Sequence, residues 1–203
     1  MKELSGPVLP GYKVYEYQLI LVPHEALCEK IALVRSEFSN AYKKDSGKSR
    51  PQLMLARFVQ YKLKEERIVN HLKTIAKGFS PFKVDLKDFG SSPTHSIFVN
   101  VTSKLPIQQL VKAVRTNTQH LMKLNNEHKP QFILEPQMNV ATRLLPWQYE
   151  KGWLEYREKH FTARFIADGM LLLKRAVGST HYETLLHFDF QSMPVAITQG
   201  ELF

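Results

Sequence analysis

The sequence contains a single cysteine, Cys28, so no disulfide can form within the chain. This usage is typical of a reducing cytoplasm, where we expect the protein to reside. No run approaches the roughly 18 consecutive apolar residues that a membrane-spanning helix needs. The start of the chain also lacks a basic segment followed by the apolar core of a secretory signal. These absences predict a soluble, unexported protein without membrane contacts.

Several chemical motifs are also missing. No Cys and His cluster has zinc spacing, no glycine-rich loop follows a predicted strand, and no serine sits in a nucleophile elbow. We therefore expect neither a metal nor a cofactor. Acidic residues are scarce, with 19 Asp and Glu against 28 Lys and Arg, for a net charge of +9. This excess favours anionic partners such as RNA, nucleotides or phosphate esters, and a solvated basic surface is the alternative.

Apolar periodicity and turn residues divide the chain into alternating strands and helices. After an irregular lead-in over residues 1–12, strands are predicted at 14–22, 51–59, 82–89, 95–101, 132–143, 161–174 and 182–190, helices at 24–42, 63–77, 106–124 and 146–156, and a tail at 191–203. Residues 82–89 and 95–101 form a predicted hairpin.

One strand motif occurs twice. Pro51-Gln52-Leu53-Met54-Leu55-Ala56 returns 85 residues later as Pro136-Gln137-Met138-Asn139-Val140-Ala141. Residues 14–89 and 95–173 share the order strand, helix, Pro-Gln strand, helix, strand, which indicates an internal pseudo-repeat rather than a coincidental dipeptide. We expect one bilobal α+β domain over residues 1–203, in which two pseudo-symmetric, mostly antiparallel sheets with outer helices surround a central cleft.

Strand parity predicts which side chains enter this cleft. Because side chains alternate along a strand, Gln52 and Met54 share one face, and Gln137 and Asn139 share the corresponding face of the second copy. Arg143 falls on the Gln137 face by the same parity, whereas Arg57 is out of phase with Gln52. We expect Arg143 to be a phosphate-binding candidate, with a surface charge at the strand end as the alternative.

This pattern resembles the two-histidine (2H) phosphoesterase superfamily, which includes LigT-like 2′-5′ RNA ligase proteins and cyclic phosphodiesterases. In that family each half carries His-apolar-Thr/Ser-apolar, usually after Pro. Here Gln52-Leu53-Met54-Leu55 and Gln137-Met138-Asn139-Val140 occupy the corresponding places. The resemblance covers about residues 14–190, and further similarity lies in Phe132-Ile133-Leu134-Glu135-Pro136, Trp153-Leu154-Glu155-Tyr156 and Leu171-Leu172-Leu173-Lys174-Arg175.

The departure from the family pattern bears directly on chemistry. The resemblance implies that one His acts as general base and the other as general acid on a 2′,3′-cyclic phosphate, while Thr or Ser hydroxyls hold phosphate oxygens. Glutamine has no pKa near neutrality, so Gln52 and Gln137 cannot move a proton. Met54 also lacks the hydroxyl, whereas Asn139 retains a hydrogen-bond donor. We expect a non-catalytic member that binds a nucleotide or RNA phosphate in the cleft.

Two alternatives stay open. The first is an active phosphodiesterase or RNA ligase-like enzyme that uses relocated groups. His160-Phe161-Thr162 has the family spacing, although eight histidines make one chance match unsurprising, and His95 at the predicted hairpin is a second candidate. The other alternative is a scaffold whose cleft binds no ligand.

Overall fold

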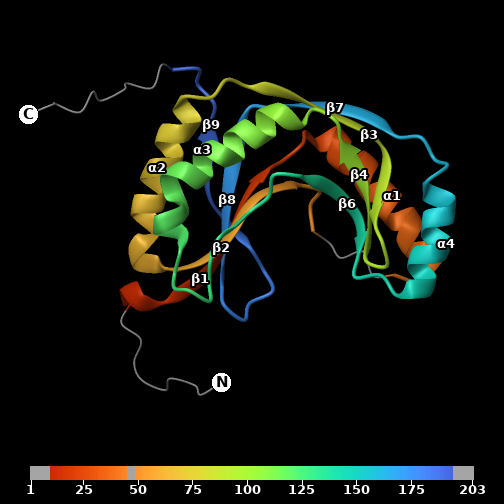
Figure 1. Ribbon diagram of the computed structural model, residues 1–203, viewed down its shortest axis with the longest axis horizontal. Coiled ribbons are helices and arrows are strands. Elements are labelled where there is room, and N and C mark those ends of the chain that lie inside the picture. Colours follow the sequence, from red (N-terminus) through yellow and green to blue (C-terminus); the bar gives the residue numbers. More distant parts are fainter. Residues whose placement is uncertain (1–9, 45–48, 194–203) are drawn as a thin grey trace, which may run out of the picture.

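The computed structural model describes residues 10–44 and 49–193, which form two antiparallel sheets flanked by helices (Figure 1). The strands are β1 (Val14–Leu21), β2 (Leu53–Tyr61), β3 (Phe82–Ser92), β4 (Ser96–Val101), β5 (Gln131–Phe132), β6 (Gln137–Thr142), β7 (Thr162–Ala167), β8 (Gly169–Ala176) and β9 (Glu183–Asp189). The helices are α1 (Glu25–Tyr42), α2 (Glu65–Lys77), α3 (Lys104–Met122) and α4 (Pro146–Tyr156), with short 3-10 turns at Pro10–Tyr12 and Lys62–Lys64.

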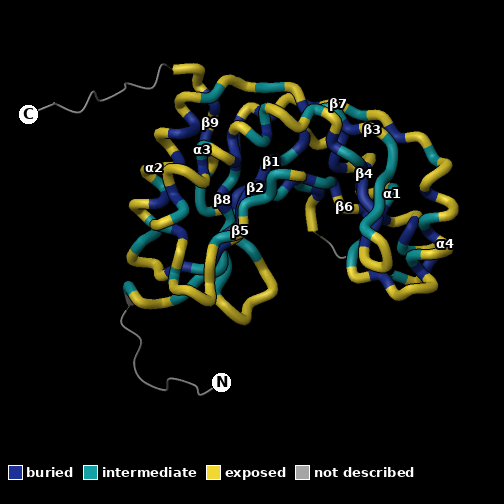
Figure 2. The backbone as a smooth tube through the Cα atoms, in the orientation of Figure 1, coloured by how far each residue is buried: buried dark blue, intermediate teal, exposed yellow. Residues whose placement is uncertain are grey.

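The first sheet has the strand order β5-β2-β1-β8-β9, and the second has the order β6-β4-β3-β7. Helices α2 and α3 pack on the first sheet, whereas α1 and α4 pack on the second. Buried residues follow the strands and the inner sides of the helices (Figure 2). The predicted α+β class with two antiparallel sheets and outer helices is confirmed.

Neither sheet is built from one half of the sequence. Helix α1 follows β1 of the first sheet yet packs on the second, and α3 follows β4 of the second sheet yet packs on the first. Each half of the sequence therefore contributes elements to both layers. The pseudo-repeat therefore describes the order of elements along the chain. It does not correspond to the two layers, because a helix can follow a strand of one sheet and pack on the other sheet.

Two predicted strands are in fact pairs of strands in different sheets. The prediction of one strand over 161–174 is wrong, because the chain leaves the second sheet at Asp168 and enters the first as β8. Gly169 sits at this crossing, where an added Cβ would lie 2.5 Å from the carbonyl oxygen of Phe188. The predicted strand 132–143 is likewise divided into β5 and β6, which flank Pro136. The alternation of apolar residues is the same on both sides of such a crossing, so it does not predict where the chain passes from one sheet to the other.

The other predicted elements agree with the observed ones to within about three residues at each end, which is the usual uncertainty of element boundaries. The predicted lead-in and tail lie outside the described residues, except for residues 10–12 and 191–193. No helix within residues 10–44 and 49–193 is long and apolar enough to cross a membrane.

The contact between α4 and the second sheet depends on the absence of a side chain at Gly152. A Cβ at Gly152 would lie 2.7 Å from Cε2 of Phe38 and 3.3 Å from Cδ1 of Ile97. Alanine favours a helix by about 1 kcal/mol over glycine, but overpacking a core costs about 1–3 kcal/mol. We therefore expect Gly152→Ala to lower the free energy of unfolding in chemical denaturation. An increase would show that the helix preference outweighs this contact.

Candidate functional site

The two copies of the repeated motif meet at one cleft. Its volume is about 170 Å³, and its lining includes Gln52 and Met54 from one copy and Gln137 and Asn139 from the other. Gln52 directly precedes β2, and the other copy lies in β6, so the two sheets supply opposite walls. The remaining lining residues are Arg35, Ser49, Arg50, Val140, Ala141 and Thr142. The structure thus brings together all four motif positions predicted from the sequence.

A β-bulge interrupts β6 immediately after Asn139. Asn139 lies opposite Phe98 of β4, but Ala141 lies opposite the adjacent Ile97, so one residue is extra in β6. The bulge shifts strand parity by one and places Thr142 on the cleft side, where it contributes to the lining. The third residue of the motif face is therefore a threonine.

The same bulge removes Arg143 from the cleft, so the prediction that it shares the Gln137 face is wrong. Arg143 follows the end of β6 with φ of 53°, is exposed, and is not among the residues that line the cleft. Its carbonyl oxygen accepts a hydrogen bond from Nζ of Lys44 at 3.1 Å. Strand parity failed here because a sequence does not display where a bulge falls.

A matching bulge occurs at the same point of the first motif. Met54 lies opposite Ile20 of β1, but Ala56 lies opposite Leu19. Arg57 consequently lies opposite Gln18 and on the cleft side of the sheet, contrary to the prediction from parity. The repeat thus extends beyond residue types to the irregularity of the backbone.

Gln52 is held by a neighbouring amide. Its Nε2 donates to Oε1 of Gln18 at 3.3 Å, and the side chain is half-buried. An amide that donates through one N–H still has a second N–H and an acceptor oxygen for a ligand. Gln137 is also half-buried, on the opposite wall. Both walls therefore present neutral groups that bind by hydrogen bonds and transfer no proton at neutral pH.

The positive charge of the cleft comes from two arginines that the sequence analysis missed. Arg35 of α1 is 9% exposed, and its Nε donates to the carbonyl oxygen of Asn139 at 2.9 Å. Its Nη1 donates to the carbonyl oxygen of Ser49 at 2.7 Å. Burial lowers the pKa of Arg35, yet an arginine stays charged under any physiological condition. The sequence did hold a sign of this burial, because Arg35 follows Ile31 by four residues and so lies on the apolar side of the helix.

Arg50 is the second cleft arginine and is more accessible than Arg35. Its side chain is about half exposed, with 54% of its surface accessible, and Nη2 lies 2.5 Å from Oε2 of Glu25. Arg50 immediately precedes the Pro51-Gln52 segment of the first motif. The two guanidinium groups thus approach the cleft from α1 and from the segment that leads into β2.

The histidines considered as relocated catalysts lie elsewhere. The His160 side chain is 92% exposed, and its Nδ1 is 3.4 Å from Oδ1 of Asp88. Thr162 is exposed at the start of β7, and His95 is exposed in the turn between β3 and β4. Within the described part of the chain, no histidine lines the cleft between Gln52 and Gln137. The structure does not bring these candidates to the repeated motif.

Glu16, two residues before Gln18 on β1, forms ion pairs with Arg57 and Arg175. Its Oε2 accepts hydrogen bonds from Nη2 of Arg175 at 2.6 Å and from the Tyr182 hydroxyl at 3.1 Å, and it lies 3.5 Å from Arg57. Partial burial favours a higher pKa, but the bonds from Arg175 and Tyr182 and the two positive charges lower the pKa of Glu16 below its usual value.

This lowered pKa predicts an acid-dependent loss of stability. A carboxyl whose pKa is lower in the folded state contributes stability above its unfolded pKa, and the contribution is lost as the pH falls through the folded pKa. We expect Glu16→Gln to be less stable than the unmodified protein by about 1–2 kcal/mol at neutral pH. The difference should shrink as the pH falls below about 4.5, the ordinary value for glutamate. A difference that is constant from neutral to acidic pH would contradict this assignment.

Two antiparallel sheets, outer helices and a central cleft with one motif copy on each wall define a LigT-like fold of the 2H phosphoesterase class. A family model described as the 2′-5′ RNA ligase superfamily matches residues 23–179. The chain therefore belongs to the 2′-5′ RNA ligase superfamily.

Solved structures agree on the fold. LigT of E. coli in its apo form superposes with a TM-score of 0.60 at 13% identity, covering 87% of this chain and 98% of LigT. The protein TT0787 of Thermus thermophilus gives a TM-score of 0.62 at 13% identity, covering 87% and 98%. A structure titled as a phosphoesterase gives 0.59 at 13% identity, covering 86% and 97%. Among curated proteins, no significant sequence match was found.

Proposed function

We propose that this chain binds the phosphate of a nucleotide or of an RNA end in its cleft and does not turn it over. The observation that carries this proposal is the placement of Gln52 and Gln137 on the opposite walls of one cleft. At the two positions where the family resemblance implies proton-transfer groups, the chain has amides. Losing a general acid or a general base removes about 10²–10⁴ in rate for each group, whereas hydrogen bonding to an anion persists.

The positive groups of the cleft support binding of an anion. Arg50 is accessible and is a bidentate donor suited to phosphate oxygens, while Arg35 contributes charge from a fixed position. Asn139 and Thr142 add uncharged hydrogen-bonding groups. Structures of E. coli LigT complexed with 3′-AMP, with ATP and with phosphate support the ligand class.

Calorimetric titration with nucleoside 2′,3′-cyclic phosphates and inorganic phosphate at low salt tests the proposal, because salt screens phosphate contacts. We expect binding by the unmodified protein, and a loss of at least about tenfold in Arg50→Gln, since one charge-assisted contact contributes about 1.5–3 kcal/mol and 1.4 kcal/mol is about tenfold. Arg143→Gln is the matched control. It removes the same charge from a residue that lies outside the cleft lining, and its affinity should be unchanged.

Two results would overturn the proposal. The first is the absence of binding to any of these ligands at low salt. The second is product formation, measured by mass spectrometry after incubation with the cyclic phosphates. Turnover that survives Gln52→Ala and Gln137→Ala but is lost in His160→Ala would favour the relocated enzyme instead.

A further inference from the structure

A long stretch of the chain has no acidic residue. No Asp or Glu occurs between Asp88 and Glu127, and all of α3 lies within this stretch. The outer surface of α3 therefore carries cations without carboxylates of the same helix to neutralise them. An unneutralised run of this kind concentrates positive potential along one element.

A groove runs along the C-terminal half of α3, on the outer side of the first sheet. Its volume is about 450 Å³, and it differs from the central cleft in every lining residue. Arg115 and His120 come from α3, and Lys123 directly follows its last residue. Lys129 lies in the segment that leads into β5, and Phe132 lies in β5 itself. The groove thus combines three permanent cations with one aromatic ring.

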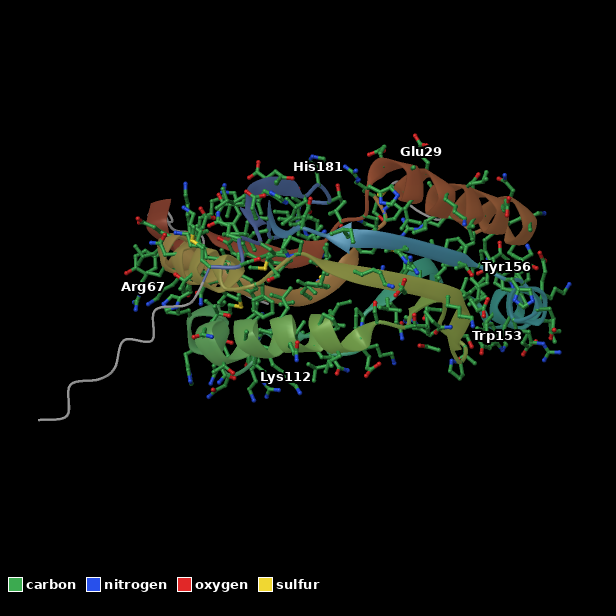
Figure 3. The ribbon with its side chains drawn as sticks, turned by 90° about the horizontal axis from the view of Figure 1, so that it is seen from above. Glu29, Arg67, Lys112, Trp153, Tyr156 and His181 are labelled. Carbon is green, nitrogen blue, oxygen red and sulfur yellow. The ribbon has the colours of Figure 1, made fainter. Side chains whose placement is uncertain are left out.

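The cations of the groove are not engaged in ion pairs within the described residues. None of Arg115, Lys123 and Lys129 has a carboxylate oxygen within 4.0 Å among residues 10–44 and 49–193. Lys112 precedes Arg115 by one helical turn and extends the same row. Figure 3 shows its side chain on the side of α3 that is turned away from the sheets. The row is therefore accessible to an external anion.

The groove continues toward the central cleft through a second hollow. That hollow is lined by Lys129, which also lines the groove, and by Arg57, which lies on the cleft side of the first sheet opposite Gln18. Two carboxylates lie at this bend, since Glu127 lines the hollow and Oε2 of Glu16 is 3.5 Å from Nη2 of Arg57. Strand β5 at this edge has two residues, so the barrier between the two sites is short. Arg57 lies opposite Gln18, the hydrogen-bond partner of Gln52, and Lys129 lines both the hollow and the groove. Cations are thus placed at intervals along a path from the motif to α3.

We propose that this path binds single-stranded RNA, with the end of the strand in the cleft and the sugar-phosphate backbone along α3. The proposal rests on the proposed function for the position of the RNA end. Regularly spaced cations suit a phosphate backbone, and an aromatic side chain within the groove offers a stacking surface for a base. Phe132 is partly buried, its side chain packs against the hydrophobic core, and its backbone pairs with β2.

The test compares RNA binding by two variants that lose the same charge. The groove variant is Arg115→Gln/Lys123→Gln/Lys129→Gln, and the matched control is Arg67→Gln/Lys73→Gln/Lys77→Gln on α2, where all three side chains are exposed. The probe is an oligouridine of about 12 nucleotides ending in a 2′,3′-cyclic phosphate. We expect the groove variant to bind it at least about tenfold more weakly, with the slope of log K against log salt reduced by about 2, since each phosphate contact contributes about 0.7.

Uridine 2′,3′-cyclic phosphate separates this proposal from the preceding one. We expect both variants to bind the mononucleotide as the unmodified protein does. If the mononucleotide does not bind but the groove variant still weakens oligonucleotide binding, the cleft proposal fails and the groove stands. Equal loss of oligonucleotide affinity in the two variants, or no oligonucleotide binding by the unmodified protein, overturns the groove proposal.

An acidic peptide is the competing partner, and stacking distinguishes it from RNA. Phe132→Leu keeps an apolar side chain but removes the ring, and we expect it to weaken oligouridine binding about fivefold. Polyglutamate of equal charge should bind more weakly than the oligouridine and should be insensitive to Phe132→Leu. Polyglutamate binding that equals that of the RNA would overturn the assignment to RNA.

Discussion

The double variant Gln52→His/Gln137→His is expected to hydrolyse a nucleoside 2′,3′-cyclic phosphate at least about 100-fold faster than the unmodified chain. Both positions line one cleft, and Arg35 and Arg50 already supply positive charge there. Imidazoles on opposite walls would provide a general base and a general acid near neutral pH. Product formation measured by chromatography at neutral pH checks the expectation. Each single histidine variant should gain less than the double variant, because it supplies only one of the two proton-transfer groups.

The control for this experiment is Gln109→His/Gln131→His, which adds two imidazoles at exposed positions outside the cleft. Hydrolysis by the control at the rate of the cleft variant would indicate unspecific catalysis. The prediction is contradicted if the cleft variant folds and binds the cyclic phosphate but forms no product. In that case the two glutamines are not the reason for an absence of turnover, and the missing hydroxyl at Met54 becomes the next candidate.

Removing the buried guanidinium of Arg35 should have the second large effect, here on stability. Arg35 joins α1 to β6 and to the residue before Arg50 through hydrogen bonds to the carbonyl oxygens of Asn139 and Ser49. Arg35→Met retains much of the side-chain volume but leaves both carbonyls without this donor. Hydrogen bonds from a charged group contribute about 1.5–3 kcal/mol each, so we expect the free energy of unfolding to fall by at least about 3 kcal/mol.

Chemical denaturation measures this change, and two variants calibrate it. Arg35→Lys retains the charge but cannot reproduce the two-pronged geometry, so its loss should be smaller than that of Arg35→Met. Arg50→Met removes an arginine whose side chain is about half exposed, and its stability should change by less than about 1 kcal/mol. Equal losses in Arg35→Met and Arg50→Met would contradict a structural role specific to Arg35.

The predicted elements were largely correct because they depend on local periodicity. Helices α1 and α2 repeat apolar residues at helical spacing, and the Gly90-Ser91-Ser92-Pro93 segment marks the region in which β3 turns into β4. The sequence pattern failed where the chain changes sheets, at Asp168 and between β5 and β6. An apolar run has the same alternation whether it continues in one sheet or crosses into another, so only long-range packing decides the crossing.

The candidate site was likewise predicted in part. The two motif copies were visible as repeated residues, and their meeting at one cleft followed from the repeat. The faces of Arg57 and Arg143 were predicted wrongly, because a one-residue bulge in each strand shifts every later side chain to the opposite face. The position of a bulge depends on how the strand pairs with its neighbour. The alternation of side chains along a single strand holds no information on that pairing.

The sequence by itself determined the family resemblance, the repeated motif, and the presence of Gln52 and Gln137 where that resemblance implies histidines. Residue identity fixes these properties, since an amide lacks a titratable proton near neutrality in any fold. The tertiary structure alone decided that Arg35 and Arg50 supply the charge of the cleft, and that helix α3, which has no acidic residue, borders a separate groove with Lys129 and Phe132. These residues are distant in sequence, and only the packing of helices onto sheets brings them together.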